Sequence, residues 1–366
     1  MSPFFSRNLA FWLICVVAAT AGAGQVTYEM VPIGNPGNPD DTGGSHIGAV
    51  AYSYQMGKFD VTIGQYTAFL NAADPDGTNP NGLYTSSLMA GDTNIAGISY
   101  APGAASGVKY SVMNNGGDSS NRPITWVSWY NAAMFANWMT NGQGNGSLMT
   151  GAYDLATAAP GIAPAKTPGA AFYIPTQSEW YKAAYYDPTL NSGSGGYWTY
   201  ATQSNTAPGN IVGSAANQAN YFNANLVTGF EGVYSVTQSS EYNPDQNYLT
   251  DVGAFSGSGS FYGTFDQNGN VYQWNDLDGT AGLMRGFLGG SWNDIDPFNL
   301  MSSFTCITVD PAFGYELLGF RIASPISASV PEIDPSSFGS ALALLMGSLG
   351  LVERRARRAL GLTTVA

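Results

Sequence analysis

The stretch from Arg122 to Trp138 reads RPITWVSWYNAAMFANW. Ser128 is a favourable helix N-cap, because its hydroxyl can accept a hydrogen bond from a backbone amide that the first helical turn leaves free. Apolar residues then recur at helical spacing along one face, namely Trp129, Ala132, Ala133, Ala136 and Met139. The stretch therefore predicts a short helix that begins after Ser128 and buries one face.

Two further helices are predicted by capping boxes, in which two side chains three residues apart satisfy free amides at a helix start. Thr62 pairs with Gln65, and Thr176 pairs with Glu179. By contrast, residues 75–121 and 187–250 are rich in Gly, Asn, Ser, Thr and Tyr and show no helical period. Short strands are predicted at Phe172–Ile174 and Phe320–Ile322, so we expect little regular structure and long loops that carry the function.

The composition describes a folded, acidic chain. Of 366 residues, 44% are hydrophobic and 10% are charged, the net charge is -13, and there are 46 glycines. The high aromatic content excludes a disordered chain. The few, scattered basic residues exclude nucleic-acid binding, which needs several cations to neutralise phosphates.

The first 24 residues resemble a secretory signal peptide. Arg7 precedes an apolar run from Leu9 to Ala19, which is followed by small residues up to Gly24. A buried N-terminal helix is the alternative. Export would remove Cys15 with the signal and leave Cys306 as the only thiol, so no internal disulfide is expected.

The last segment, residues 328–360, has three parts in order. A Pro-Glu motif (VPEIDP, 330–335) precedes 15 apolar or small residues at 338–352 and then a cluster of arginines. Fifteen residues reach only about 22 Å, short of the roughly 30 Å hydrocarbon core of a bilayer. This order resembles the PEP-CTERM sorting signals that exosortases process. The resemblance implies transient membrane association, an exosortase-type processing partner, and a final location at the cell envelope surface or outside the cell.

The body of the chain is more acidic than the whole. Residues 25–330 hold seven basic and 22 acidic residues, a net charge of -15. An acidic, cysteine-poor exported domain suits a calcium-bearing surface protein better than an anion binder.

Four segments, in order, resemble the formylglycine-generating enzyme family, also called the sulfatase-modifying factor family. They are MGKFDVTIGQYTAFLNA from Met56, the stretch from Arg122, FYIPTQSEWYKAAYYDP from Phe172, and a segment that begins with GNVYQW at Gly269, continues through RGFLGGSWND and ends with LGFRIA at Ala323. The resemblance implies one α+β domain over residues 25–327, with a C-type lectin-like fold, little regular secondary structure and long loops. Its motif tryptophans are expected to be core anchors, namely Trp129, Trp138, Trp180 and Trp274.

The family's chemistry depends on two cysteines that hold copper and oxidise a cysteine of a protein substrate. In this family the pair follows a Gly-Gly-Ser segment, here Gly289–Ser291, and the corresponding positions are Asp294 and Asn299. Neither side chain is a soft thiolate ligand, so a copper site is not expected. The lone Cys306 cannot replace the pair and is expected to be a small buried residue. His46 is the only histidine and is expected in a loop or at a strand edge rather than as a catalytic base.

The loss of this pair predicts a non-catalytic binding or structural module, with a glycan or matrix component as the ligand. An oxidoreductase of the formylglycine-generating type, acting on a protein cysteine through another site, is the alternative. A passive envelope protein is a third interpretation. Acidic residues at and after the cysteine positions either hold an ion or sugar hydroxyls, or form solvated turns; they are Asp294, Asp296, Asp310 and Glu316.

The resemblance also implies calcium. One family site takes side-chain oxygens and carbonyls at positions that correspond to Asp266, Gly269, Val271 and Gln273. Ca²⁺ accepts carboxylate, amide and carbonyl oxygens alike, so these residues are candidate ligands; a loop-shaping turn at Asp266 is the alternative. A second family site would use Asn220 and the carbonyl of Tyr221, with Asp245 or Asp251.

Overall fold

Three helices begin at the predicted caps. They are α1 (Ile63–Ala73), α3 (Trp129–Thr140) and α4 (Gln177–Tyr185), capped by Thr62, Ser128 and Thr176. Each cap hydroxyl accepts a hydrogen bond from the backbone amide three residues on, at 3.1–3.2 Å. The Ser128 cap is also a complete capping box, because the Asn131 side chain accepts from the Ser128 amide at 2.9 Å. These predictions are confirmed.

The computed structural model describes residues 25–43, 46–224, 229 and 231–326. The predicted signal peptide (1–24) and sorting segment (328–360) lie outside the described residues. Backbone contacts divide the chain into one unit that ends at Pro325 and a second that begins at Ile326. Within the described ranges, no helix has the length and apolar character needed to cross a membrane.

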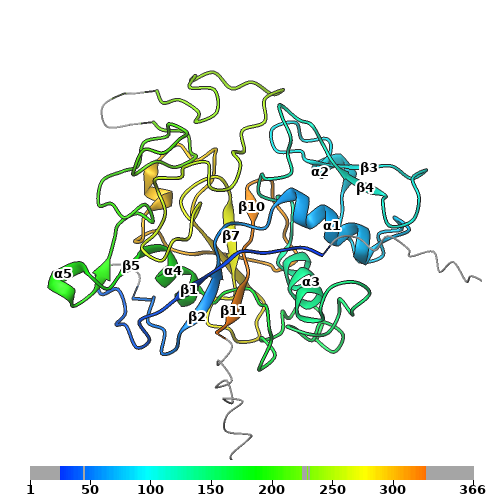
Figure 1. Ribbon diagram of the computed structural model, residues 1–366, viewed down its shortest axis with the longest axis horizontal. Helices are drawn as coiled ribbons and strands as arrows, with labels where there is room; N and C mark the ends of the chain where they lie inside the picture. The colour runs from blue at the N-terminus through cyan, green and yellow to red at the C-terminus, as the bar shows by residue number, and fades with distance from the viewer. Residues whose placement is uncertain (1–24, 44–45, 225–228, 230, 327–366) are drawn as a thin grey trace, which may run out of the picture. The chain divides into compact units, whose positions relative to one another are not determined.

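Short strands form two small sheets at the centre of the first unit (Figure 1). One sheet has the order β1-β2-β11, with both pairs antiparallel. The other has the order β10-β7-β8-β9, in which β10 runs parallel to β7 and the other pairs are antiparallel. The bounds are β1 (Met30–Ile33), β2 (Tyr54–Gly57), β11 (Ala323–Pro325), β7 (Tyr272–Asn275), β8 (Arg285–Leu288), β9 (Ile307–Val309) and β10 (Leu318–Gly319).

The remaining elements are short, and all but a 3₁₀ turn lie in or beside the loop-rich stretches 75–121 and 187–250. They are α2 (Ser86–Met89), α5 (Leu190–Gly193), the antiparallel pair β3 (Ile98–Tyr100) and β4 (Tyr110–Val112), the pair β5 (Tyr186–Asp187) and β6 (Gly196–Tyr197), and a 3₁₀ turn at Pro297–Leu300. The predicted α+β class, with little regular structure and long loops, is confirmed.

The two strands predicted from short alternating runs are wrong in position. Within Phe172–Ile174, only Tyr173 pairs, in an isolated bridge with Ala323. Phe320–Ile322 lies between β10 and β11. There the carbonyls of Phe320 and Ile322 accept hydrogen bonds from the amides of Val61 and Gly57, but the segment is part of no strand.

The core is built on large aromatic side chains. Trp129, Trp138, Trp180 and Trp274 are each at most 2% exposed, which confirms them as core anchors. Burying an indole removes a large apolar area from water and dominates local packing energy.

A buried cation joins the two sheets. Arg321, between β10 and β11, donates to the carbonyls of Gly57 and Phe265 at 3.0 and 2.7 Å. It also donates to Gln273 Oε1 at 2.7 Å and forms an ion pair with Asp60 at 3.3 Å. Because Gly57 ends β2 and Gln273 lies in β7, this one side chain bridges both sheets.

Candidate functional site

Asp294 and Asn299, the two positions predicted to correspond to the family's cysteines, lie in contact. Asn299 Nδ2 donates to Asp294 Oδ1, which also accepts from the Tyr272 hydroxyl at 3.0 Å. Asp294 Oδ2 accepts from the amide and the hydroxyl of Ser291 at 2.6 and 2.9 Å. Burial raises the pKa of the Asp294 carboxyl. The Asp294 carboxylate therefore accepts hydrogen bonds at both oxygens. It closes a turn at the place where the family resemblance would put a copper-binding thiolate pair.

Cys306 does not replace that pair. Its sulfur lies against Asn275 and the carbonyl of Phe287, at 3.5 and 3.6 Å. Burial raises the pKa of the thiol to about 11, so the thiolate needed for nucleophilic attack or for metal binding is scarce at neutral pH. Cys306 is the only cysteine in the part of the chain that the structure describes.

Beside this turn, three aromatic rings stack in parallel. Tyr248 lies on Trp292 with centroids 4.7 Å apart and an interplanar angle of 5°, and Tyr242 lies 5.8 Å from Tyr248 at 12°. The innermost ring, Trp292, is 4% exposed, whereas the outermost, Tyr242, is 53% exposed. The Tyr242 hydroxyl donates to Asn94 Oδ1, which orients the ring. The stack therefore presents one well-held aromatic ring to solvent.

A cavity of about 380 Å³ opens at this stack, and we call it the Trp292 pocket. Tyr234 contributes another wall, with its ring centroid 4.5 Å from that of Tyr248. Two carboxylates and two amides supply the polar groups. The lining residues are Asp92, Asn94, Tyr234, Tyr242, Trp292, Asn293 and Glu316.

The acidic residues singled out in the sequence divide between two roles. Asp296 and Asp310 each accept a backbone amide two residues on, at 2.9 and 2.8 Å, so they are turn formers. Glu316 lines the Trp292 pocket instead. Burial, followed by the negative charge of Asp92, raises the pKa of the Glu316 carboxyl. Sequence reasoning missed Asp92 and Tyr242, which lie in loops without periodic signals.

The sulfatase-modifying factor enzyme 1-like domain family matches residues 21–326. The chain belongs to this family. Among solved structures, the chain is similar to CarF, with 19% identity, 82% of this chain and 99% of the other covered, and a TM-score of 0.41. It is also similar to Treponema denticola variable protein 1, with 18% identity, 83% of this chain and 97% of the other covered, and a TM-score of 0.41. A third similar structure is PvdO from Pseudomonas aeruginosa, with 16% identity, 82% of this chain and 92% of the other covered, and a TM-score of 0.40. A search of curated proteins gave no match.

In this member of the sulfatase-modifying factor family, Gln273 does not fit the role of a calcium ligand. Its only side-chain oxygen accepts from Trp180 Nε1 and from Arg321 Nε, both at 2.7 Å. A divalent cation at that oxygen would meet a guanidinium. The Gln273 amide donates to the carbonyl of Asp266 at 2.7 Å, so this predicted ligand pair is joined by its own hydrogen bond.

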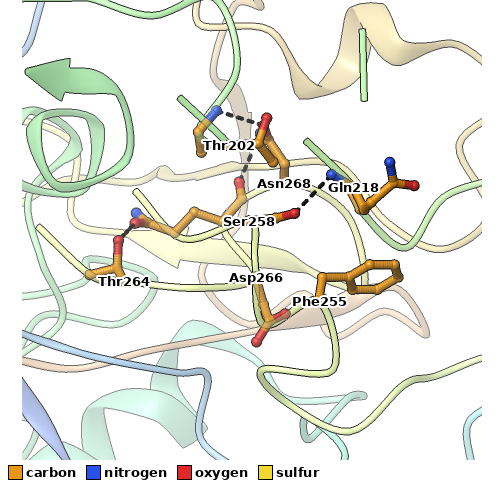
Figure 2. A pocket seen from close by; sticks show the side chains of 10 residues that line it. Thr202, Gln218, Phe255, Ser258, Thr264, Asp266 and Asn268 are labelled. Carbon is orange, nitrogen blue, oxygen red and sulfur yellow. Dashed lines mark hydrogen bonds between the residues drawn. The ribbon is translucent and has the colours of Figure 1, made fainter. Parts of the chain in front are cut away.

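Asp266 lines a cavity of about 10 Å³, room for about one water molecule (Figure 2). Its carboxylate accepts from the amide of Gly253 at 2.6 Å. Figure 2 shows that this carboxylate points away from Ser258 and Asn268, which line the same cavity. The polar groups of the cavity therefore do not converge on Asp266.

The second predicted set lies next to the first, because Asn220 and Gly269 form an isolated bridge. The side-chain amide of Asn220 donates to the backbone carbonyl of Tyr248 at 2.9 Å, and the backbone carbonyl of Tyr221 accepts from the Ser235 hydroxyl at 3.2 Å. Asp245 is exposed, and Asp251 lines a separate cavity of about 570 Å³. Within the described ranges, no three His, Cys, Asp or Glu side chains are grouped to hold a metal. Calcium binding stays a prediction.

The predicted loop position of His46 agrees with the structure, where it is exposed and has a left-handed backbone at φ 56°. Its amide donates to the carbonyl of Asp41 at 3.1 Å.

The Asp266 carboxyl is expected to make stability depend on pH. Burial raises its pKa from 3.8 to about 6, so the folded state keeps a proton that the unfolded chain has already lost. This contribution is complete below pH 3.8 and is lost as the pH rises through 6. The free energy of unfolding should therefore fall between pH 4 and pH 7 in the parent protein. In the presence of a chelator, this fall should be about 1–3 kcal/mol smaller in Asp266→Asn. Equal pH slopes in urea denaturation would contradict this assignment.

Proposed function

We propose that this protein is an exported surface protein whose sulfatase-modifying-factor domain binds a glycan in the Trp292 pocket and carries out no oxidation. The observation that carries the proposal is the exposed Tyr242 ring at the end of a parallel stack, with carboxylates and amides around it. Binding pockets typically combine such aromatic surface with a few polar groups that set the orientation of the ligand.

A sugar ring matches both kinds of surface. Its C–H face packs on an aromatic ring, and its hydroxyl groups donate to carboxylates and accept from amides. Asp92, Glu316 and Asn293 supply such partners along the pocket wall.

The absence of an oxidation step in the proposal rests on the turn at Asp294. Its carboxylate takes donors from Ser291, Asn299 and Tyr272, and neither former cysteine position offers a soft ligand. Copper is therefore no part of the proposed function, and no residue is assigned a catalytic role.

The export and sorting parts of the proposal rest on the amino-acid sequence alone. Residues 1–24 would direct export, and residues 328–360 would bring transient membrane association and processing by an exosortase-type enzyme. A protein delivered in this way to the cell surface would meet surface glycans or matrix components. Its body charge of -15 disfavours nucleic acid as a partner.

Calcium is retained as a separate proposal that the binding function does not need. If Asp266 with the carbonyls of Gly269 and Val271 holds Ca²⁺, calcium will raise the melting temperature relative to EDTA, and Asp266→Asn will abolish the increase. An unchanged melting temperature would remove calcium from the account and leave the glycan site intact.

Glycan binding is tested by replacing the exposed ring. A glycan array with the parent protein identifies a ligand, and Tyr242→Ala should weaken its binding by about tenfold, because an aromatic contact contributes about 1–2 kcal/mol. Phe261→Ala is the matched control, since Phe261 is exposed but does not line the pocket. Retained binding in Tyr242→Ala, or no ligand on the array, would contradict the proposed function.

A further inference from the structure

The Trp292 pocket holds negative charge that no basic side chain in the described part of the chain balances. All seven basic residues between 25 and 326 are engaged elsewhere. Three form ion pairs: Lys58 with Glu29, Arg285 with Asp276, and Arg321 with Asp60. Lys109, Arg122 and Lys182 donate to backbone carbonyls, and Lys166 lies over the Tyr173 ring. Asp92 and Glu316 therefore face the pocket without a counter-charge from the described residues.

Resting on the proposed function, we propose that the Trp292 pocket selects glycans with a free ammonium group, that is, hexosamine units that carry no N-acetyl group. An ammonium has three donors and one positive charge, which match the carboxylates of Asp92 and Glu316. The exposed Tyr242 ring adds a cation–π surface beside them. One bound group thus uses both features of the pocket.

The competing sugars lack this match. An N-acetyl group removes the charge and leaves both carboxylates unpaired, whereas a uronic acid brings a third carboxylate into the same cavity and is repelled. Burial and then the charge of Asp92 raise the pKa of the Glu316 carboxyl, so a second negative group in the pocket is disfavoured and a cation beside these carboxylates is favoured.

Calorimetric titration of the full protein with three trimers tests the inference: glucosamine, N-acetylglucosamine and galacturonic acid, at low salt and at a pH that keeps the amine protonated. The glucosamine trimer should bind about tenfold more tightly than the N-acetylated trimer, and the acidic trimer most weakly. The double variant Asp92→Asn, Glu316→Gln should lose this preference. Glu241→Gln should keep it, because Glu241 is an exposed carboxylate near Tyr242 in the chain that does not line the pocket.

Equal or tighter binding of the N-acetylated trimer would overturn the inference while the proposed glycan site stands. A preference for glucosamine that survives in the double variant would also overturn it, because the general negative charge of the protein would then be the cause. If no trimer binds and the array also yields no ligand, the proposed function fails as well.

Discussion

Arg321→Met is expected to lower the free energy of unfolding by about 3–5 kcal/mol, the usual cost of leaving one member of a buried ion pair alone. Arg321 and Asp60 have fully buried side chains, and the same guanidinium supplies donors to Gly57, Phe265 and Gln273. Methionine would keep much of the volume but would leave Asp60 without its counter-charge and remove the guanidinium donors from the carbonyls of Gly57 and Phe265, whereas Gln273 Oε1 would keep the hydrogen bond from Trp180 Nε1. Urea denaturation followed by tryptophan fluorescence measures the change.

Two variants control this result. Lys58→Met breaks the Lys58–Glu29 pair, whose side chains are 29% and 60% exposed, and should cost less than about 1 kcal/mol. Adding Asp60→Leu to Arg321→Met should recover part of the loss, because the uncompensated carboxylate is removed. A loss of less than about 1 kcal/mol in Arg321→Met would contradict the role of this side chain as the bridge between the sheets.

The double variant Asp294→Cys, Asn299→Cys is expected to change copper binding from undetectable to one Cu(I) per chain. The two side chains are already in contact, so two thiolates would lie within reach of one soft ion. The substitution also removes the acceptor of Ser291 and Tyr272, so a loss of stability of about 1–3 kcal/mol accompanies it. Native mass spectrometry under reducing conditions, with Cu(I) added, measures the stoichiometry.

The parent protein and the two single variants are the comparisons. The parent retains Cys306 and shows whether that thiol binds copper on its own, and each single variant supplies one thiolate at the site. Copper binding in the double variant that does not exceed binding in either single variant would mean that these positions do not correspond to the family's pair.

Helix starts could be predicted because their signals are local. Thr62, Ser128 and Thr176 each act on a backbone amide three residues away, so the sequence contains both partners. Phe320–Ile322 could not be placed in the same way. Its carbonyls pair with Val61 and Gly57, more than 250 residues away in the chain, and no periodic pattern reports such a pairing.

The Trp292 pocket was only partly predictable for a similar reason. Glu316 was recognisable as an acidic residue after the predicted cysteine positions, but Asp92 and Tyr242 come from loops whose places are set by tertiary contacts. Gln273 shows the converse. Its residue type suits calcium, yet the fold brings Arg321 and Trp180 to the same oxygen. Sequence patterns thus name candidate ligands, and packing decides which atoms remain free.

The most direct test of the account is mass spectrometry of a Cys-x-Pro-x-Arg peptide after incubation with the purified protein, copper and oxygen. We expect the cysteine thiol to stay unchanged, because Asp294 and Asn299 form a hydrogen-bonded pair at the positions predicted to correspond to the family's copper-binding cysteines. Conversion of the thiol to an aldehyde would contradict it, since the protein would then generate formylglycine without the paired cysteines.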